Sequence, residues 1–566
     1  MLDFKVKVID LLQEEIDALS REEISALIEI PPSYDLGDYA FPVFRLSKVF
    51  RKAPNIIAEE LVGKLGQNEY FEKIENKGPY VNFFINRAKL VETVVEEVRA
   101  KADNYGATDV GQGRTVIVEY SSPNIAKPFH IGHIRTTVIG NALYKIYKFL
   151  GFNTIAINHL GDYGTQFGML ISAYKKWGDR EVIEQDPINE LLKLYVRFNK
   201  EADEDESLRD EARYWFKELE NGNEEAYALW EWIREISLKE FNKVYDMLNI
   251  KFDSYAGESF YSDKMPRVIE ELKEKDLLKE SEGAYIVDLE EYDMPPALIQ
   301  KSDGSTLYIT RDIAAAIYRK EHYDFYKNIY VVASQQNLHF KQWFKVLELM
   351  GYEWAKDCIH VPFGMVSLED GTLSTRKGRV VFLEDVLKKA VAGIMEIMEE
   401  RNPDLENKEE VAKQVGIGAV VFQELFNQRI KDYVFSWDKV LSFEGETGPY
   451  VQYTHARANS LLERGSFNIA DDVDYGLLLS EDEINIIRLI YDFPKVVIDA
   501  MEKYEPFYIT RQVVEIAKAF NKFYNSSQII VEDEELKKAR LMLTYMVKNT
   551  IKIGLGLLGI EAPNKM

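Results

Sequence analysis

At 566 residues the chain is too long for one hydrophobic core, and three or four domains are expected. Its 46% hydrophobic and 29% charged residues are ordinary for a globular protein, and its longest apolar runs are too short to span a bilayer. A single cysteine, Cys358, excludes intrachain disulfides and multi-cysteine zinc sites. The formal net charge of −25 opposes a nucleic-acid partner on average, although a local basic surface can still bind one.

The N-terminal region, residues 1–105, is predicted to be a compact α+β unit. It combines helical periodicity in VIDLLQEEIDAL and IAEELVGKL with a strand-like YVNFFIN, and it ends near the turn-rich DNYGATDVGQGR. The opening segment reads as an amphipathic helix and not as a signal peptide, so we expect a cytoplasmic protein.

The central region, residues 106–405, is predicted to be an α/β domain. Strand patterns at TVIVEY and NTIAIN flank a helix over 132–150, and the alternation returns as NIYVVAS, LHFKQWFKVLELMG and IHVPFGMV. Between the two halves, residues of about 174–300 are helical, acidic and rich in Trp and Tyr. A Rossmann-type parallel sheet split by a helical insertion is the simplest account. Residues 406–566 read almost entirely as helices, which predicts an all-α bundle.

Two histidines, His130 and His133, stand where the first predicted strand gives way to its helix. In an open parallel sheet, ligands collect at the carboxyl ends of strands, where helix N-termini present free N–H groups. The apolar spacing that follows places one helical face on the sheet and leaves both imidazoles at the open end. Lys127 adds a full positive charge. The segment therefore predicts a site for phosphate oxygens.

A second basic segment lies far downstream, between Gly371 and Gly378. In an otherwise acidic chain it contains, in order, Leu373, Ser374, Thr375, Arg376 and Lys377. Such a loop can close over a polyphosphate and stabilise charge that develops in the transition state. Taken alone, it fits a solvated surface turn better; together with the histidines it points to phosphate chemistry.

Six segments in order along the chain carry a family resemblance: SSPNIAKPFHIGHIRTT, NHLGDYGTQFGML, TLYITRDIAAAIYR, SQQNLHFKQ, LSTRKGRVVFLEDVL and SFEGETGPYVQYTHAR. The histidine and loop segments resemble the two signature motifs of class I aminoacyl-tRNA synthetases, and the six together resemble arginyl-tRNA synthetases. The resemblance implies that residues 1–105 contact the outer corner of the tRNA, that 106–405 are catalytic, and that 406–566 bind the anticodon.

The resemblance implies a two-step reaction of ATP, L-arginine and tRNA(Arg), with Mg²⁺ on the phosphates. Arginine carboxylate displaces pyrophosphate from ATP, and the arginyl group then passes to the 2′-hydroxyl of the terminal adenosine. ATP would be bound by His130, Gly132, His133, Leu373, Ser374 and Thr375. The residues that stabilise the transition state would be His130, His133, Lys127, Arg376 and Lys377. Thr372 and Thr375 replace the usual loop lysines, so Lys127 is expected to be the main phosphate-binding cation.

Arginine as a substrate demands a carboxylate, because a buried guanidinium with unpaired N–H groups is costly. Glu119 and Asp312 match the family's guanidinium-binding acids, and the resemblance completes the arginine pocket with Asn124, His159, Tyr308 and Gln336. Asp312 equally fits a first-turn acid favoured by the helix dipole. No protein-bound metal is expected, and packing is the expected role of His339.

Contacts with tRNA are expected at two places. Tyr80 and Asn82 fall where some members of the family read a D-loop base, although Lys77 replaces an asparagine there. In the C-terminal region Tyr450, Tyr453 and Arg457 combine aromatic faces with a cation, the mix that stacks splayed bases. A buried aromatic stripe has the same pattern.

No membrane partner is expected, and a monomer is the default.

Three alternatives stay open. A nucleotidylyltransferase of the same superfamily uses a similar histidine motif for ATP but leaves the helical C-terminus without a role. A sister synthetase for cysteine would need zinc thiolates, which Cys358 alone cannot supply. A sister synthetase for glutamate would need an arginine where Glu119 and Asp312 stand. A catalytically silent tRNA-binding protein would have no physical need for all five of the residues His130, His133, Lys127, Glu119 and Asp312.

Overall fold

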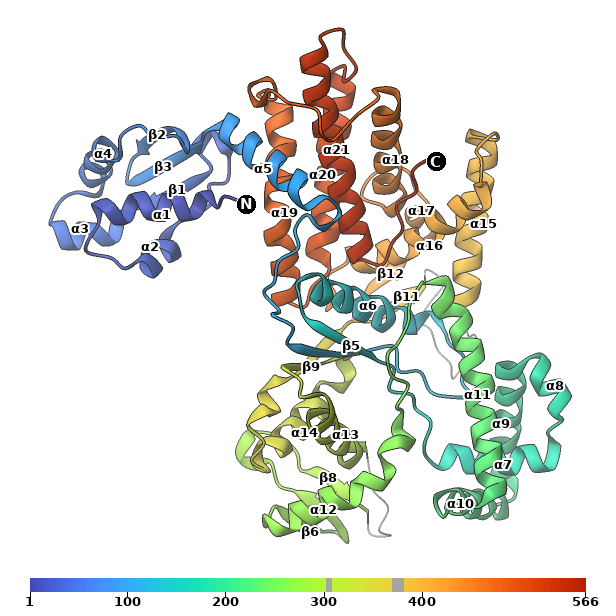
Figure 1. Cartoon of the computed structure of the whole chain (residues 1–566). Coiled ribbons are helices and arrows are strands. Elements are labelled where there is room, and N and C mark those ends of the chain that lie inside the picture. Colours follow the sequence, from blue (N-terminus) through green and yellow to red (C-terminus); the bar gives the residue numbers. More distant parts are fainter. Residues whose placement is uncertain (302–307, 369–380) are drawn as a thin grey trace. The chain divides into compact units, whose positions relative to one another are not determined.

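A computed structural model describes residues 1–301, 308–368 and 381–566 (Figure 1). The chain divides into two compact units. The first comprises Met1–Tyr105, Thr454–Pro494 and Glu515–Ile553; the second comprises Gly106–Tyr453, Lys495–Val514 and Gly554–Met566. Within the described ranges, no helix is long and apolar enough to cross a membrane.

The N-terminal part of the first unit is built on a three-stranded antiparallel sheet of order β1–β3–β2. Its elements are α1 (Phe4–Glu15), α2 (Arg21–Leu27), β1 (Tyr39–Pro42), α3 (Phe44–Phe50), α4 (Pro54–Leu65), β2 (Phe71–Lys77), β3 (Tyr80–Ile85) and α5 (Arg87–Lys101). β2 and β3 form a hairpin in which Lys77 pairs with Tyr80 across Gly78, whose φ of 59° suits a glycine. The predicted α+β character of this region is confirmed.

The core of the second unit is a four-stranded parallel sheet of order β10–β9–β4–β5. Its strands and the helices between them are β4 (Thr115–Glu119), α6 (Ile134–Phe149), β5 (Asn153–Ile157), α13 (Tyr308–Tyr323), β9 (Lys327–Ala333), α14 (Asn337–Leu349) and β10 (Cys358–Phe363). Three successive residues of β4 are fully buried, as expected for a strand covered on both faces. The predicted Rossmann-type sheet is confirmed.

Helices α13 and α14 pack on one face of this sheet through a shared core. Ile313 and Ile317 of α13 meet Trp343 and Val346 of α14 in that core, together with Ile117 of β4. Because both helices are anchored in this way, polar side chains at their N-terminal ends have fixed positions at the carboxyl edge of the sheet.

The insertion between the two halves differs from the prediction. Helices α7 (Thr165–Trp177), α8 (Arg180–Gln185), α9 (Pro187–Glu204), α10 (Ser207–Glu220) and α11 (Glu224–Met247) cluster together (Figure 1). They are followed by α12 (Met265–Glu274) and by an antiparallel sheet of β6 (Leu278–Ser281), β7 (Ala284–Val287) and β8 (Ala297–Gln300). The all-helical prediction for 174–300 is therefore wrong at its end. The strands are four residues long and β6 is largely exposed, so they carry little periodicity.

The strand predicted at IHVPFGMV is two strands. It leaves the main sheet at Gly364 and continues as β11 (Val366–Leu368), which pairs with β12 (Tyr433–Phe435). A Cβ on Gly364 would come within 2.6 Å of Asp432 Oδ1, so only glycine allows this close approach. The remaining helices are α15 (Leu383–Arg401), α16 (Lys408–Phe426), α17 (Trp437–Val440), α18 (Gly448–Arg464), α19 (Glu481–Glu502), α20 (Phe507–Ser526) and α21 (Glu534–Leu557). The C-terminal region is helical as predicted, but it is not all-α, because β12 lies within 406–566.

Candidate active site

The loop that leaves β4 toward the histidines is held in a strained conformation. Three of its residues have positive φ angles: Ser121 (70°), Ser122 (48°) and Ala126 (59°). Such strain persists only where the surroundings fix it. The Ser121 hydroxyl lies 2.8 Å from the hydroxyl of buried Tyr245, and the Ala126 N–H donates to Ser237 Oγ at 3.1 Å. Helix α11 of the insertion therefore holds the loop that carries Asn124 and Lys127.

The two motif histidines lie against each other at the start of α6, with ring centroids 4.0 Å apart. The Gly132 N–H donates to His130 Nδ1 at 3.1 Å, and the His130 N–H donates to His133 Nδ1 at 3.2 Å. Burial lowers the pKa of His130, and it lowers the pKa of His133 to about 3. Both imidazoles are therefore neutral near pH 7. Because His130 Nδ1 accepts from Gly132, His130 carries its proton on Nε2, which provides an N–H donor for an anionic oxygen.

The predicted downstream loop, with Leu373, Ser374, Thr375, Arg376 and Lys377, lies outside the described residues. The residues that follow it are described, and they pair with the histidine segment. The Ile131 N–H donates to the Val381 carbonyl, and the Leu383 N–H donates to the Phe129 carbonyl, each at 3.0 Å. The histidine segment is thus paired with the segment that follows the loop, about 250 residues further along the chain.

Glu119 ends β4 as predicted. Its carboxylate is already paired with another side chain of the protein. Arg319 Nη1 lies 2.5 Å from Glu119 Oε2, and both side chains are buried. Arg319 Nη2 lies 3.3 Å from His159 Nδ1, so this histidine joins the same cluster. Sequence analysis missed Arg319. The available signal was its position on α13, two turns after Asp312 and therefore on the same helical face.

Asp312 lies at the same edge of the sheet, and its carboxylate contacts His339. The distance from His339 Nε2 to Asp312 Oδ2 is 2.5 Å, and both side chains are partly exposed. The expectation that His339 only packs is therefore wrong. Within the described part of the chain, no lysine or arginine forms an ion pair with Asp312.

Two other acids at this edge, like Glu119, hold arginines of their own. Arg311 Nη1 lies 3.0 Å from Glu258 Oε2, and Arg234 Nε lies 3.0 Å from Asp162 Oδ2, which is fully buried. Burial raises the pKa of Glu258 to about 7, against the lowering effect of Arg311. Among the acids described here, Asp312 thus stands apart, because its partner is an imidazole and not a guanidinium.

The remaining predicted pocket residues differ in exposure. Asn124 is exposed, and its loop pairs with Gly161, where an added Cβ would lie 2.1 Å from Asn124 Oδ1. Tyr308 opens α13 with 66% of its side chain exposed, and Gln336 is exposed just before α14. Lys127 is partly buried. These polar side chains are available to a ligand at the carboxyl edge of the sheet.

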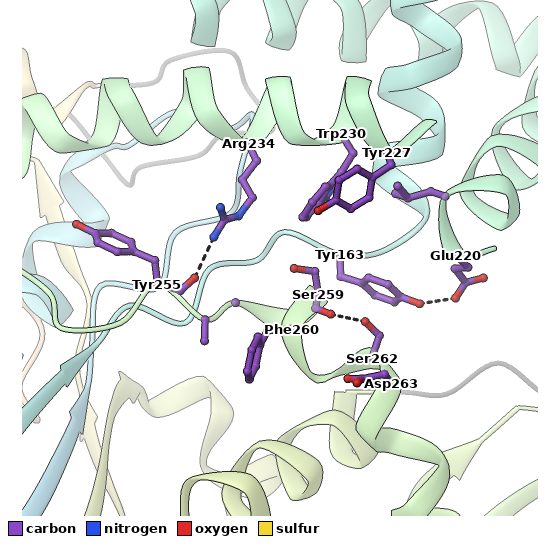
Figure 2. A pocket seen from close by; sticks show the side chains of 13 residues that line it. Tyr163, Glu220, Tyr227, Trp230, Arg234, Tyr255, Ser259, Phe260, Ser262 and Asp263 are labelled. Atoms are coloured by element: carbon purple, nitrogen blue, oxygen red, sulfur yellow. Dashed lines mark hydrogen bonds between the residues drawn. The ribbon is translucent and has the colours of Figure 1, made fainter. Parts of the chain in front are cut away.

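A cavity of about 780 Å³ lies between α11 and the short 3₁₀ helix Glu258–Lys264. Its walls are rich in aromatic rings: Tyr163, Tyr227, Trp230, Tyr255 and Phe260 (Figure 2). The Tyr163 ring also lies 4.8 Å from the Arg311 guanidinium. This aromatic pocket therefore shares a wall with the acid cluster, by which we mean Glu119, Asp162, Glu258 and Asp312. Sequence analysis did not single out the pocket, because its rings come from distant segments.

In the N-terminal sheet the two predicted tRNA contacts differ in exposure. Tyr80 is partly exposed and packs edge-on against Phe44, with ring centroids 5.7 Å apart. Asn82 is only 3% exposed, and its Nδ2 donates to the Leu36 carbonyl at 2.7 Å. A nucleotide contact by Asn82 would therefore require that hydrogen bond to break.

Beside Tyr80, α3 and the turn after it form an exposed basic and apolar surface that sequence analysis missed. We call it the α3 surface; its exposed members are Phe44, Arg45, Lys48, Val49, Phe50, Arg51 and Lys52. The signal was a run of nine residues, FRLSKVFRK, with four cations and no acid.

The three residues predicted in the C-terminal region all lie on α18. Tyr453 is 39% exposed, and Tyr450 is partly exposed. Arg457 donates to Asn521 Oδ1 at 2.6 Å, and its guanidinium lies over the Tyr524 ring. Arg457 is therefore engaged within its own unit.

Comparison with known proteins gives the family. Residues 94–437 match the family model for the catalytic domain of class I tRNA synthetases (R), 7–85 match an arginyl tRNA synthetase N-terminal domain, and 451–566 match a DALR anticodon binding domain. The chain belongs to the class I aminoacyl-tRNA synthetases.

Relatives narrow this assignment. The arginine–tRNA ligases of Halothermothrix orenii and Clostridioides difficile are 65% and 62% identical over all 566 residues, covering 100% of each chain. The solved arginyl-tRNA synthetase of Plasmodium falciparum is 25% identical with a TM-score of 0.82, covering 99% of this chain and 98% of that one. Within its class, the chain belongs to the arginyl-tRNA synthetase family, and it is an aminoacyl-tRNA ligase.

Proposed function

We propose that the chain activates L-arginine with ATP and transfers it to the 2′-hydroxyl of the terminal adenosine of tRNA(Arg). The observation that carries this proposal is the pairing at the carboxyl edge of the sheet. Glu119, Glu258 and Asp162 each hold an arginine of the chain, whereas Asp312 holds an imidazole. A substrate guanidinium supplies the cation that Asp312 lacks. Glu119 then acts in the pocket together with Arg319 and not as a free acid.

In the first step an arginine carboxylate oxygen bonds to the α-phosphorus of ATP, and the bond to the bridging oxygen breaks to release pyrophosphate. The neutral imidazoles of His130 and His133 donate ring N–H groups to phosphate oxygens, and Lys127, Arg376 and Lys377 offset the developing negative charge. We propose that Mg²⁺ enters with ATP, because this ion is commonly held by phosphate oxygens and water.

In the second step the 2′-hydroxyl attacks the arginyl carbonyl and AMP leaves. The aromatic pocket fits the single-stranded 3′ end of the tRNA, because aromatic rings stack bases regardless of sequence. Its shared wall with the acid cluster, at Tyr163, supports a position for this strand next to the activated arginine.

Further tRNA contacts belong to the terminal regions. Residues 1–105 contact the outer corner of the tRNA through Tyr80 and the α3 surface, and residues 406–566 bind the anticodon arm. Residues 106–405 form the catalytic domain in this scheme. The protein works as a monomer in the cytoplasm.

ATP–pyrophosphate exchange and tRNA charging test the proposal together. Exchange is measured for a panel of amino acids with and without total tRNA, and charging is measured with labelled arginine. Exchange and charging with arginine alone among the panel support the proposal. Exchange that depends on no amino acid would instead favour a nucleotidylyltransferase. Binding of tRNA with neither exchange nor charging would favour a catalytically silent binding protein.

A further inference from the structure

The contact between His339 and Asp312 joins two rigid helices. Asp312 is followed on α13 by the fully buried Ile313. His339 is followed on α14 by Phe340, which is buried against the Tyr330 ring at 5.4 Å between centroids. Because both neighbours are fixed in the core, the 2.5 Å contact from Nε2 to Oδ2 has little freedom to shift.

This contact orients Asp312 and leaves its other carboxylate oxygen, Oδ1, outside the contact. A donor on Oδ2 fixes the plane of the carboxylate, which otherwise rotates freely at a side chain that is 28% exposed. Histidine is a donor that need not carry a full charge, whereas a lysine or arginine at this position would always bring a cation that repels a second guanidinium. In Glu119, Glu258 and Asp162 the carboxylate is already paired with an arginine of the chain and is not open to a second guanidinium.

We propose that His339 is a positioning residue for arginine, holding the Asp312 carboxylate in the plane that the substrate guanidinium meets. The inference rests on the proposed function. This role explains why Asp312 is paired with a histidine. The imidazole orients the carboxylate but leaves room for the substrate guanidinium to bind it.

Steady-state tRNA charging of the full chain tests the inference. In His339→Leu, which removes the donor at similar volume, the KM for arginine is expected to rise about 10-fold while the KM for ATP stays within about twofold. His339→Gln, which restores an N–H donor at similar reach, is expected to bring the KM for arginine back to within about threefold of wild type. His322→Leu is the matched control, because His322 is exposed at the far end of α13.

A merely structural role gives different results. It would raise both KM values together, and Gln would not rescue the KM for arginine alone; each of these overturns the inference, as does an unchanged KM for arginine. Should the Leu variant fold poorly, a double-mutant cycle of His339→Ala and Asp312→Asn, measured beside both single variants, decides. The histidine change is then expected to have no further effect once Asp312 is neutral, and an additive effect overturns the inference. Failure of the wild type to charge arginine would instead reject the proposed function.

Discussion

At the scale of single residues, the two predicted guanidinium acids separate into different roles. Glu119→Gln leaves Arg319 charged and unpaired in the interior, which should cost about 3–5 kcal/mol and lower Tm strongly. Asp312→Asn removes a partly exposed charge that no lysine or arginine of the described residues pairs with, so Tm should change little while the KM for arginine rises about 10–100-fold. Thermal unfolding and charging kinetics on both variants measure this separation.

The opposite pattern would contradict the assignment. If Glu119→Gln kept its Tm and lost arginine affinity, Glu119 and not Asp312 would be the main acceptor of the substrate guanidinium. Glu119→Ala is unsuitable for this comparison, because the shorter side chain would also open a cavity beside Arg319.

The neutral state of the motif histidines predicts a pH dependence. Because burial lowers the pKa of His133 to about 3, the unfolded chain binds more protons than the folded one between about pH 3 and pH 6.5. Stability from this group is therefore complete above about pH 6.5 and falls on acidification, by up to about 1.4 kcal/mol per pH unit. His133→Gln removes the titrating group, so its Tm should fall less than that of wild type between about pH 7 and pH 5.

Thermal unfolding at several pH values checks this, with His322→Gln as the control for an exposed histidine. A wild type and His133→Gln that lose Tm in parallel would show that His133 is not held neutral by burial.

Residue types and their places on strands or helices could be predicted from the sequence, whereas their partners could not. Glu119 ends its strand, and His130 caps the 3₁₀ turn Ile131–His133 that leads into α6, close to where the pattern of apolar residues predicts a helix. The contacts of Arg319 and His339 depend on how α13 and α14 pack, and that packing is set by side chains far away in sequence. The resemblance supplied the candidate ligands but not the internal arginines.

At the scale of elements, the aromatic pocket between α11 and the 3₁₀ helix predicts a selective loss of tRNA affinity. Tyr227 and Phe260 line it and are 48% and 41% exposed, so their replacement by alanine should leave the fold intact. If they stack single-stranded bases, each change should raise the KM for tRNA about 10-fold. Tyr214→Ala, a similarly exposed change on α10 outside the pocket, is the control.

A tRNA shortened at its 3′ end shows whether the pocket contacts that end. Wild type should bind the shortened tRNA less tightly than the full one, and the pocket variants should bind both alike. Variants that lose affinity equally for both tRNAs would mean that the rings act elsewhere on the RNA.

Elements with regular periodicity were predicted and short irregular ones were not. The long strands and helices of the main sheet match their apolar patterns, because burial on a parallel sheet leaves a continuous signal. The β6–β7–β8 sheet was missed because its strands are too short for alternation to appear. β11 was merged with β10 because the close approach at Gly364 to Asp432 involves a residue 68 positions later, which local sequence does not show.

At the scale of the whole molecule, discontinuous units are the feature that sequence patterns do not reveal. The first unit joins Met1–Tyr105 to parts of helices α18–α21, and the rest of those helices belongs to the second unit. A division into consecutive ranges, such as 1–105, 106–405 and 406–566, follows changes in composition along the chain. Compact units instead follow contacts in space, so one long helix can belong to both.

The net charge of −25 and the α3 surface together predict how tRNA binding responds to salt. Since the average field repels RNA, binding depends on local cations that displace counterions, and log K should fall linearly with log salt. Reversing two exposed cations, Arg45→Glu with Lys48→Glu, should weaken tRNA binding at low salt and make the slope shallower by about 1–2. Filter binding over a range of KCl concentrations measures both quantities.

Lys279→Glu is the control, because Lys279 is an exposed cation on β6. Its substitution changes the net charge by the same amount as each substitution on α3. If charge reversal at α3 and at Lys279 weakened binding equally per residue, the total charge and not the α3 surface would govern association. Arginine-dependent exchange at saturating tRNA should be unchanged in the α3 variant, because its substitutions lie in the other unit from the acid cluster. A change in the KM for arginine would show that the N-terminal contact also sets the geometry of the arginine pocket.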